Sequence, residues 1–455
     1  MARTKLDALV VGAGAAGLAA ARELSNAGLS ATIVEARDRI GGRVFTLHDR
    51  NSPLPIELGA EFVHGEAPQT FAIIRAAGLT AAELSGTHYW SRNGRFSSRM
   101  DFWRRLEDVR KKMSRAVASG KKDLSLDDFL NHNKIAPKTR QMMINFVQGY
   151  HAGHPEKISV RSLVGGDDEE QPDSRQFRIV NGYDAVVHWL RDGMDPEKVE
   201  LRLNTIATEI IWKPRHVSIH CSSRTGATLD AFEAHAAIVT VPHAVLKARG
   251  LLFRPDLTQK QNAVQRLEAG QICKMIFRFR HAFWEEDDFL RKRLEKGVSS
   301  SEGLAFAHAS DADVPVWWTT MPCRSPLLTA WVGGPKADLL LNENEQDRIE
   351  KALNALSKVF AVPRRVIDEL LESWAMHDWR SDPFSRGAYM YIPVGSMNAQ
   401  AALGKPVEQT LFFAGEATDF AEMGTVTGAI KSGRRAAQEL IRALPASVRR
   451  RAALS

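Results

Sequence analysis

Apolar residues recur along the chain with two different periods, and this pattern predicts both strands and helices. Residues 6–11 form a short apolar run, which is typical of a buried parallel strand. An Ala-rich segment then predicts a helix that ends at Gly28, before a second strand over residues 30–34. Further helical and strand patterns follow, over residues 100–150, 237–241, 272–280 and 304–332. We therefore expect an α/β protein.

Length, composition and charge agree with a large globular protein. The chain has 455 residues, more than the ~150 common for one domain, so two domains or one large α/β unit are expected. Hydrophobic residues make up 44% and charged residues 25%, which argues against disorder. The net charge is +7, but no basic stripe carries interleaved aromatic residues, so nucleic-acid binding is not indicated. Residues 446–455 are expected to form a basic tail.

Cysteine spacing and hydropathy exclude further classes of protein. Cys221, Cys273 and Cys323 lie far apart without a C-x-x-C, so neither a disulfide framework nor a thiolate metal site is predicted. His151 and His154 lack a paired acid, and no metal site is expected. No apolar run approaches the ~18 residues that span a bilayer, and the N-terminus lacks the pattern of a signal peptide. We expect a cytoplasmic protein of unknown oligomeric state with no transmembrane segment.

A glycine fingerprint follows the first predicted strand. Gly12, Gly14 and Gly17 form G-x-G-x-x-G, and their roles are a tight turn, close approach of the backbone to a pyrophosphate, and close helix–strand packing. The pyrophosphate would lie over the helix N-terminus, where free N–H groups favour negative charge. Glu35 ends the second strand and can accept hydrogen bonds from ribose hydroxyls, while it would repel a 2′-phosphate. The loop residues expected at the ligand include Ala13, Ala16 and Ala36.

Segments from both ends of the chain point to a long ligand. Arg37, Arg39 and Arg43 stand beside Gly42 just after the fingerprint and can neutralise a diphosphate. Nearly four hundred residues later, a strand leads to Gly415 and Glu416, followed by a small-residue helix over residues 424–433. A ligand that is contacted by segments from both ends of the chain should be long, which favours FAD over NAD. No second glycine fingerprint is present for NAD(P)H, so electrons are expected to come from an organic substrate.

Together with later motifs, these segments resemble the flavin-containing amine oxidase family, which includes monoamine, polyamine and L-amino-acid oxidases. The resemblance runs through nearly the whole chain and rests on residues 12–17, 35–43, 57–65, 240–247, 274–284, 379–389 and 413–416. It implies a FAD-binding Rossmann-like domain joined to a substrate domain of mixed sheet and helices. The implied FAD contacts beyond the fingerprint are Glu35, Ala36, Arg37, Gly42, Arg43, Gly59, Ala60, Glu61, Ile206, Trp379, Gly415, Glu416, Thr425 and Val426.

The resemblance also implies a discontinuous domain layout. The FAD domain is expected to combine residues 1–78, 198–265 and 386–445. The substrate domain is expected to combine residues 79–197 and 266–385.

Lys274 stands where amine oxidases hold a lysine that binds a water near flavin N5. From the pattern alone it would be a solvent-facing lysine on the polar side of a strand. The resemblance instead implies a positive charge that stabilises negative charge on the reduced flavin or on oxygen.

Tyr389 corresponds to one wall of the aromatic cage that guides an amine in this family. Monoamine oxidases have a flavin-linked cysteine at the preceding position, whereas this chain has Ala388, so FAD is expected to bind without that link. The second cage tyrosine is replaced by Thr425. The alternative second walls are Trp317, Trp318, Trp331 and Trp379.

His64 lies in a tract that resembles the polyamine-oxidase branch. With a pKa near neutral, it could help remove the ammonium proton, since only the free amine supports hydride loss. The expected function is thus oxidation of a small amine, with hydride transfer to flavin N5, hydrolysis of the imine, and reduction of oxygen to hydrogen peroxide. The alternatives are a flavin desaturase or dehydrogenase with another acceptor, and a FAD-binding scaffold without turnover.

Overall fold

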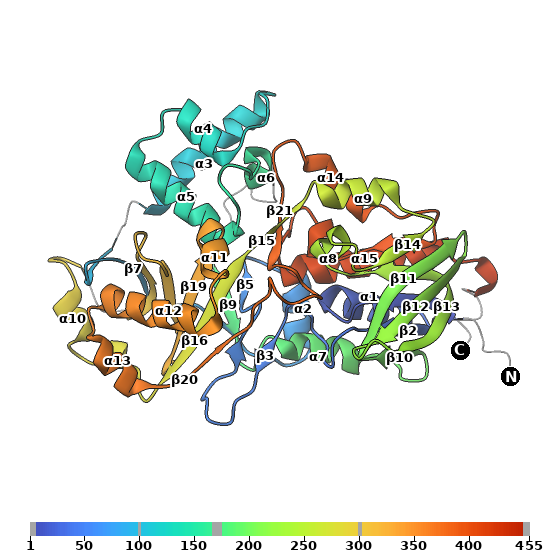
Figure 1. Ribbon diagram of the computed structural model, residues 1–455, viewed down its shortest axis with the longest axis horizontal. Helices are drawn as coiled ribbons and strands as arrows, with labels where there is room; N and C mark the ends of the chain where they lie inside the picture. The colour runs from blue at the N-terminus through green and yellow to red at the C-terminus, as the bar shows by residue number, and fades with distance from the viewer. Residues whose placement is uncertain (1–5, 99–101, 166–174, 299–302, 449–455) are drawn as a thin grey trace.

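The computed structural model describes residues 6–98, 102–165, 175–298 and 303–448. Figure 1 shows two lobes side by side, each built on a large sheet, with helices α3 to α6 projecting at the top of the view. Most of the predicted basic tail, residues 449–455, lies outside the described residues. No helix in the described ranges combines the length and apolar character needed to cross a membrane.

The first sheet contains the strand that the sequence predicted before the glycine fingerprint. Its eight strands are β10 (Val199–Arg202), β2 (Ala31–Val34), β1 (Leu6–Val11), β13 (Thr228–Val239), β12 (His216–Ser223), β11 (Thr205–Lys213), β14 (Leu252–Arg254) and β22 (Leu411–Phe413). β1 runs parallel to β2 and β13, and β22 runs parallel to β13. The carboxyl ends of these strands therefore meet at one edge, where ligands bind in open α/β sheets.

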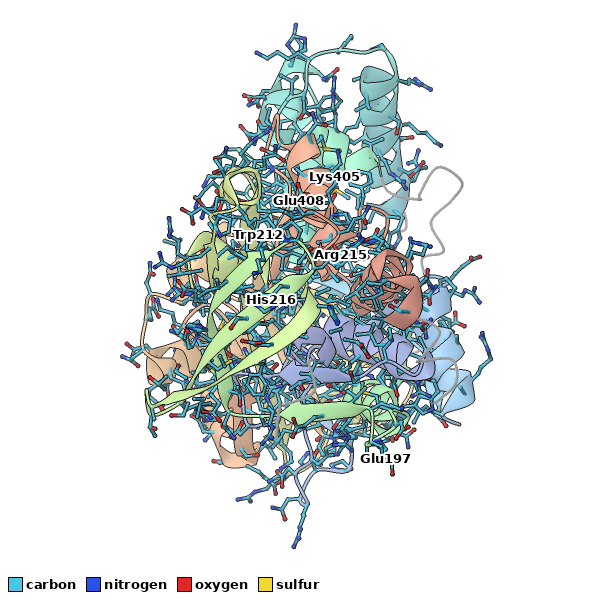
Figure 2. All side chains as sticks on the ribbon, turned by 90° about the vertical axis from the view of Figure 1, so that its right-hand side faces the viewer. Glu197, Trp212, Arg215, His216, Lys405 and Glu408 are labelled. Atoms are coloured by element: carbon cyan, nitrogen blue, oxygen red, sulfur yellow. The ribbon has the colours of Figure 1, made fainter. Side chains whose placement is uncertain are left out.

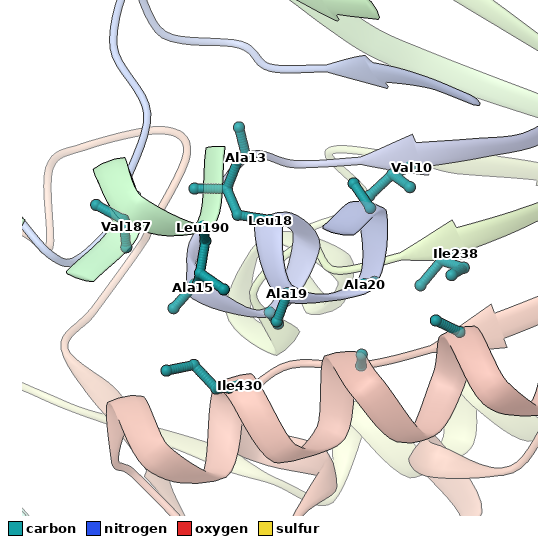
Figure 3. Close-up of a cluster of buried hydrophobic side chains, with 14 of the residues drawn as sticks. Val10, Ala13, Ala15, Leu18, Ala19, Ala20, Val187, Leu190, Ile238 and Ile430 are labelled. Atoms are coloured by element: carbon teal, nitrogen blue, oxygen red, sulfur yellow. The ribbon is translucent and has the colours of Figure 1, made fainter. Parts of the chain in front are cut away.

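Helix α1 (Ala15–Asn26) is held between this sheet and α15 (Val426–Ala443). Figure 3 shows the alanines of α1 facing Ile430 of α15. A side chain at Gly433 would lie 2.1 Å from the backbone oxygen of Ala16, so the two helices approach too closely for any larger residue. Helices α1 and α15, which come from opposite ends of the chain, are thus packed directly together.

Helix α7 (Asp184–Asp192) corrects one predicted boundary. Residues 79–197 were expected in the substrate domain, but α7 contacts α1 and buries Val187 and Leu190 in the core of the first lobe (Figure 3). Its apolar face needs a partner surface, and the alanine-rich α1 supplies it. The rest of the two-domain division remains our proposal.

The second sheet contains the strands predicted over residues 272–280 and 304–332. Its order is β20 (Leu371–Met376), β16 (Ile272–Phe279), β19 (Leu327–Gly333), β18 (Val316–Thr319), β17 (Leu304–His308), β7 (Thr87–Arg92) and β8 (Arg95–Ser97). Aromatic residues such as Phe277, Trp317 and Phe360 fill its core. The packing helices are α10 (Phe289–Arg293), α11 (Pro335–Leu340), α12 (Glu345–Phe360) and α13 (Arg364–Leu370), with a short η1 (Phe283–Glu285).

Smaller elements connect the two lobes. The predicted helical region forms α3 (Phe102–Ala118), α4 (Leu126–His132), α5 (Pro137–His151) and α6 (Val160–Val164). Small sheets comprise β5 (Phe62–His64), β9 (Gln176–Ile179) and β6 (Ala81–Glu83), then β15 (Glu268–Gly270) with β21 (Tyr389–Tyr391), and β3 (Thr46–Leu47) with β4 (Ile56–Glu57). The first lobe also carries α2 (Pro68–Ala76), α8 (His243–Lys247), α9 (Thr258–Gln265), α14 (Met397–Gly404) and η2 (Glu416–Thr418).

The outer side of the first lobe is a broad antiparallel surface of β11, β12 and β13. Figure 2 shows Trp212, Arg215 and His216 at the turn between β11 and β12, close to Lys405 and Glu408. The Arg215 backbone N–H donates to Thr410 Oγ1 at 2.9 Å, which ties this turn to the segment before β22. This turn is level with the start of β1, so it lies at the end of the sheet opposite the carboxyl ends of the parallel strands.

Candidate active site

A cavity of about 1310 Å³ is lined by both lobes. This volume exceeds the roughly 300–1,000 Å³ of a pocket for one drug-sized ligand, so it has room for a dinucleotide and a second ligand. Most of the predicted site residues line it, namely Gly12, Gly14, Ala16, Glu35, Ala36, Arg37, Gly42, Arg43, Gly59, Ala60, Glu61, His64, Ile206, Lys274, Trp379, Tyr389, Gly415, Glu416, Thr425 and Val426. Ala13 and Gly17 do not line it.

The three fingerprint glycines have the separate roles that the motif predicted. Gly12 has φ +105°, a conformation that L side chains rarely adopt, and begins the turn. A side chain at Gly14 would meet nothing closer than Gly41 O at 4.0 Å, so its backbone faces the cavity. A side chain at Gly17 would lie 1.9 Å from Gly12 O. Gly17 therefore permits the helix to pack on the turn rather than contacting the ligand.

Glu35 organises the loop around the nucleotide end. Its Oε2 accepts a hydrogen bond from the Ala13 backbone N–H at 2.7 Å, and its Oε1 accepts from the Arg37 backbone N–H at 2.9 Å. Ala13 is thus linked to the site through Glu35, although its side chain lies in the core. A buried carboxylate that faces the cavity can still accept from ribose hydroxyls with its remaining lone pairs.

The arginines after Glu35 have protein partners that the spacing did not reveal. The Arg37 guanidinium donates to both oxygens of Asp382 at 2.8 and 2.9 Å. Arg39 does not line the cavity, and its guanidinium lies 3.8 Å over the ring of Phe45. The expectation that all three arginines neutralise a diphosphate is therefore wrong for Arg39, and Arg37 is already paired. Arg37 instead joins this loop to the C-terminal third of the chain, whereas Arg39 donates within its own segment, to Ile40 O and Val44 O.

Arg43 and Glu416 connect the loop to the C-terminal strand at the cavity wall. Arg43 Nη1 pairs with Glu416 Oε1 at 2.9 Å and also donates to the backbone oxygen of Ala388. The second oxygen of Glu416, Oε2, is buried and has no hydrogen-bond partner in the described part of the chain. Since an unpaired buried acceptor is costly, this oxygen is suited to a hydroxyl of a bound ligand. The cradle thus fits a dinucleotide with a polyhydroxyl chain.

Lys274 is buried, so the alternative of a solvent-facing lysine is wrong. Its side chain is 3% exposed, and Nζ pairs with Glu61 Oε2 at 2.5 Å and donates to Gly59 O at 3.2 Å. Arg178 and Trp318 Nε1 both donate to Glu61 Oε1, the latter at 3.0 Å. Two cations therefore face one carboxylate, and these three groups together carry a net positive charge, which nearby Glu57 offsets when it is ionised.

The pKa values of two buried glutamates, Glu57 and Glu61, are shifted in opposite directions. Burial alone would raise the pKa of Glu61, but Lys274 and Arg178 lower the pKa to about 2. Burial raises the pKa of Glu57 to about 7, although hydrogen bonds from the Tyr183 backbone and Thr46 favour its charged form. Glu61 is thus ionised and holds Lys274 in place. Arg178 was not predicted, because a single Arg in a short strand carries no local signal, and Glu57 was noted only as part of the motif over residues 57–65.

The aromatic wall contains Tyr389 but no second tyrosine at Thr425. Tyr389 Oη donates to Tyr150 O at 2.7 Å, and its ring would lie 3.4 Å from a side chain placed at Gly424. Thr425 caps α15, since its Oγ1 accepts from Gly428 N–H at 3.0 Å and donates to Glu422 O. Among the candidate second walls, Trp318, Trp331 and Trp379 line the cavity, whereas Trp317 is buried in the core of the second lobe.

His64 does not have the near-neutral pKa that we expected of a proton acceptor. Burial lowers its pKa to about 4, so the imidazole is uncharged at neutral pH and only weakly basic. Its ring packs against Phe62 and Tyr150 at centroid distances of 6.2 and 5.5 Å. His64 therefore forms part of an uncharged aromatic wall.

Metal and thiol chemistry find no support in the described residues. No group of three or more His, Cys, Asp or Glu that could hold a metal ion occurs among them. No cysteine appears in the described lining of the cavity, and Ala388 occupies the position before Tyr389.

Known proteins resemble this chain over most of its length. A family model described as flavin containing amine oxidoreductase matches residues 15–441. Polyamine oxidase 3 of Oryza sativa subsp. japonica is 29% identical over 95% of this chain and 88% of that protein. Lysine-specific histone demethylase 1 homolog 2 of the same organism is 27% identical over 97% of this chain but only 58% of that protein. A solved structure of a putrescine oxidase bound to putrescine has the same fold, with a TM-score of 0.78 at 20% identity over 96% of this chain and 99% of that chain.

Replacing Glu35 with alanine should weaken FAD binding at least about ten-fold, because a hydrogen bond to a charged group contributes ~1.5–3 kcal/mol. Glu35→Gln keeps one acceptor oxygen and should lose less. Titration of the apoprotein with FAD measures both effects. Asp38→Ala is the matched control, since Asp38 is an exposed acid on the same loop, paired only at the surface with Arg224. Unchanged affinity of Glu35→Ala would contradict the nucleotide assignment.

The cofactor should be released by acid precipitation, because Ala388 cannot form the cysteine link. The yellow colour is expected in the supernatant, and its absorbance should match the protein's flavin content before precipitation. Colour that stays in the washed pellet would show a covalent bond to another residue.

Proposed function

This chain belongs to the flavin-containing amine oxidoreductases, with FAD as cofactor, and on that premise we propose that it is an amine oxidase that uses molecular oxygen. The observation that carries the proposal is the buried ammonium group of Lys274 in the wall of the cavity that also contains the nucleotide cradle. A fixed positive charge in a site shielded from water favours chemistry in which negative charge develops. The cytoplasmic location remains a prediction.

Bound FAD supplies the hydride acceptor N5 and returns two electrons to oxygen, so that RCH₂NH₂, O₂ and H₂O yield RCHO, NH₃ and H₂O₂. The residues of this chain supply position and charge. Lys274 is fixed by Glu61 and Gly59 O, so its ammonium group is oriented before any ligand binds. Because Arg178 shares Glu61, the positive charge of Lys274 is only partly neutralised and can stabilise negative charge on oxygen.

The wall residues orient the amine and exclude water. Tyr389 is fixed through its hydroxyl group, and Trp379 is fixed because its Nε1 donates to Leu58 O at 3.0 Å. Both rings line the cavity, so they can hold a substrate without moving. Since His64 is uncharged above about pH 4, it does not repel an approaching ammonium group. The substrate proton can leave to water before hydride loss.

The proposal is tested by measuring, for the same amine, the reduction of the flavin and the yield of hydrogen peroxide. A panel of primary, secondary and methylated amines should include at least one that bleaches the flavin without oxygen and then yields one peroxide per carbonyl product in air. Bleaching without peroxide would indicate a dehydrogenase or desaturase with another acceptor. If no amine bleaches the flavin, the chain is a FAD-binding scaffold and the proposed function is wrong.

Lys274→Met should slow reoxidation by oxygen about 10²–10³-fold while anaerobic reduction by the best amine changes much less. The substitution keeps the length of the side chain and removes its charge, and stopped-flow absorbance of the flavin separates the two half-reactions. Lys336→Met is the control, because Lys336 lines the same cavity but is held by Ser310 O and Ala312 O. Equal slowing of both half-reactions would indicate a displaced flavin instead, and no slowing would contradict the role of Lys274.

A further inference from the structure

The cavity continues past Lys274 into a channel between helices α3 and α5 and the second sheet. Its walls come from the inward faces of α3 and α5 and from β7 and β17. The apolar side chains that line this part are Trp90, Phe102, Leu106, Met113, Met143 and Phe146. These six side chains are uncharged, and the charged residues of α3 in the same lining are Glu107 and Arg110.

A chain of ring contacts leads along this channel from the candidate active site. His64 contacts Tyr150, and Tyr150 stacks on Phe146 at 5.4 Å with an interplanar angle of 7°. Phe146 contacts Trp103 at 6.3 Å, and Trp103 contacts His88 at 6.2 Å. The wall is thus continuously aromatic over these five residues.

The far end of the channel is a cluster of four flat rings that are close to parallel. His88 contacts Phe306 and His308 at centroid distances of 4.4 and 5.3 Å, Phe306 and His308 are 6.1 Å apart, and His308 contacts Trp90 at 4.9 Å. His88 Nδ1 and His308 Nε2 are 3.1 Å apart, a hydrogen bond in which one imidazole donates to the other. Burial lowers the pKa of His88 and of His151 to about 4, so these two imidazoles are uncharged at neutral pH.

The carboxylates near the channel are either paired or in contact with solvent. Glu61 uses both oxygens, one for Lys274 and the other for Arg178 and Trp318. The other carboxylates in the described lining of the cavity are Glu35, Glu66, Glu107, Glu416 and Glu422. Glu35 and Glu416 lie at the nucleotide end, and Glu422 precedes α15. Glu66 is exposed, and the side chain of Glu107 is 44% exposed and pairs with Lys111.

From this arrangement we infer that the substrate is a monoamine with an apolar alkyl or aromatic body, rather than a diamine or polyamine. The inference rests on the proposed function and specifies its substrate class. When such a body binds, its apolar surface leaves water and contacts the aromatic wall. The resulting gain in binding free energy is proportional to the apolar area buried. Within the aromatic part of the channel, a second ammonium group would be desolvated where the described lining offers no buried carboxylate that is free to pair with it, and it would lie near the cations Lys274 and Arg178. Cation–π contact with the rings compensates only part of that cost.

A size-matched pair of amines tests the inference on the unmodified holoenzyme. Hexylamine and pentane-1,5-diamine have the same number of heavy atoms. Hexylamine ends in a methyl group where the diamine has a second ammonium group. We expect kcat/KM, and the anaerobic rate of flavin reduction at low substrate, to favour hexylamine at least about 100-fold, since an unpaired buried charge is strongly disfavoured. 2-Phenylethylamine should also be a better substrate than the diamine.

Equal or better turnover of pentane-1,5-diamine or spermidine would overturn the inference and leave the proposed amine oxidase activity intact. If no amine reduces the flavin, the proposed function fails and the inference fails with it. The two failures are therefore distinguishable in one experiment.

A charge-introducing variant tests the physical cause. Phe146 lines the channel, is partly exposed and stacks on Tyr150, so Phe146→Glu places a carboxylate within the aromatic wall. It should raise the ratio of diamine to monoamine kcat/KM at least about ten-fold, the factor expected of one charge-assisted contact. Phe146→Gln, which has the same shape without the charge, should leave the ratio unchanged. If both variants change the ratio equally, lost packing rather than charge determines the preference and the inference is wrong.

Discussion

The buried ion cluster of Lys274, Glu61 and Arg178 is the interaction on which this site depends. A charge withdrawn from water persists only beside a compensating charge and further hydrogen bonds. Lys274 comes from β16, Glu61 from the segment between β4 and β5, and Arg178 from β9. Because these buried charges must pair with one another, their ion pairs hold the second sheet against the nucleotide-binding lobe. Since two cations share one carboxylate, the cluster also leaves a positive charge in the cavity wall. One arrangement therefore both joins the lobes and supplies the electrostatic character of the site.

The nucleotide end depends on a second set of long-range contacts. Arg37 pairs with Asp382 and Arg43 pairs with Glu416, so the loop after β2 is held by residues more than three hundred positions away. The close packing of α1 on α15, which requires a glycine at Gly433, brings the same two ends of the chain together. Each contact satisfies a buried group of the protein, while Glu416 Oε2 is left for the ligand. The cradle is thus assembled before FAD binds.

Burial determines the chemical character of the remaining walls. His64, His88 and His151 are uncharged because desolvation disfavours their protonated forms. Histidines that would be pH-sensitive at the surface therefore act as flat polar rings within an aromatic channel. The same effect raises the pKa of Glu57 while Glu61, four residues later, is kept ionised by its two cations.

The sequence by itself determined the local elements, the glycine fingerprint with Glu35 and the lack of a linking cysteine at position 388, and it indicated Tyr389 as a wall residue. These features depend on residues close together in the chain, where periodicity, turn geometry and motif spacing are informative. Only the tertiary structure decided that Lys274 faces inward, that Arg37 and Arg39 are already engaged, that α7 packs on α1 and that His64 is uncharged. It also revealed Arg178 and the cluster of rings around His88. The physical reason is that burial and ion pairing are set by partners hundreds of residues apart, and no local pattern specifies which distant side chain will meet a given charge.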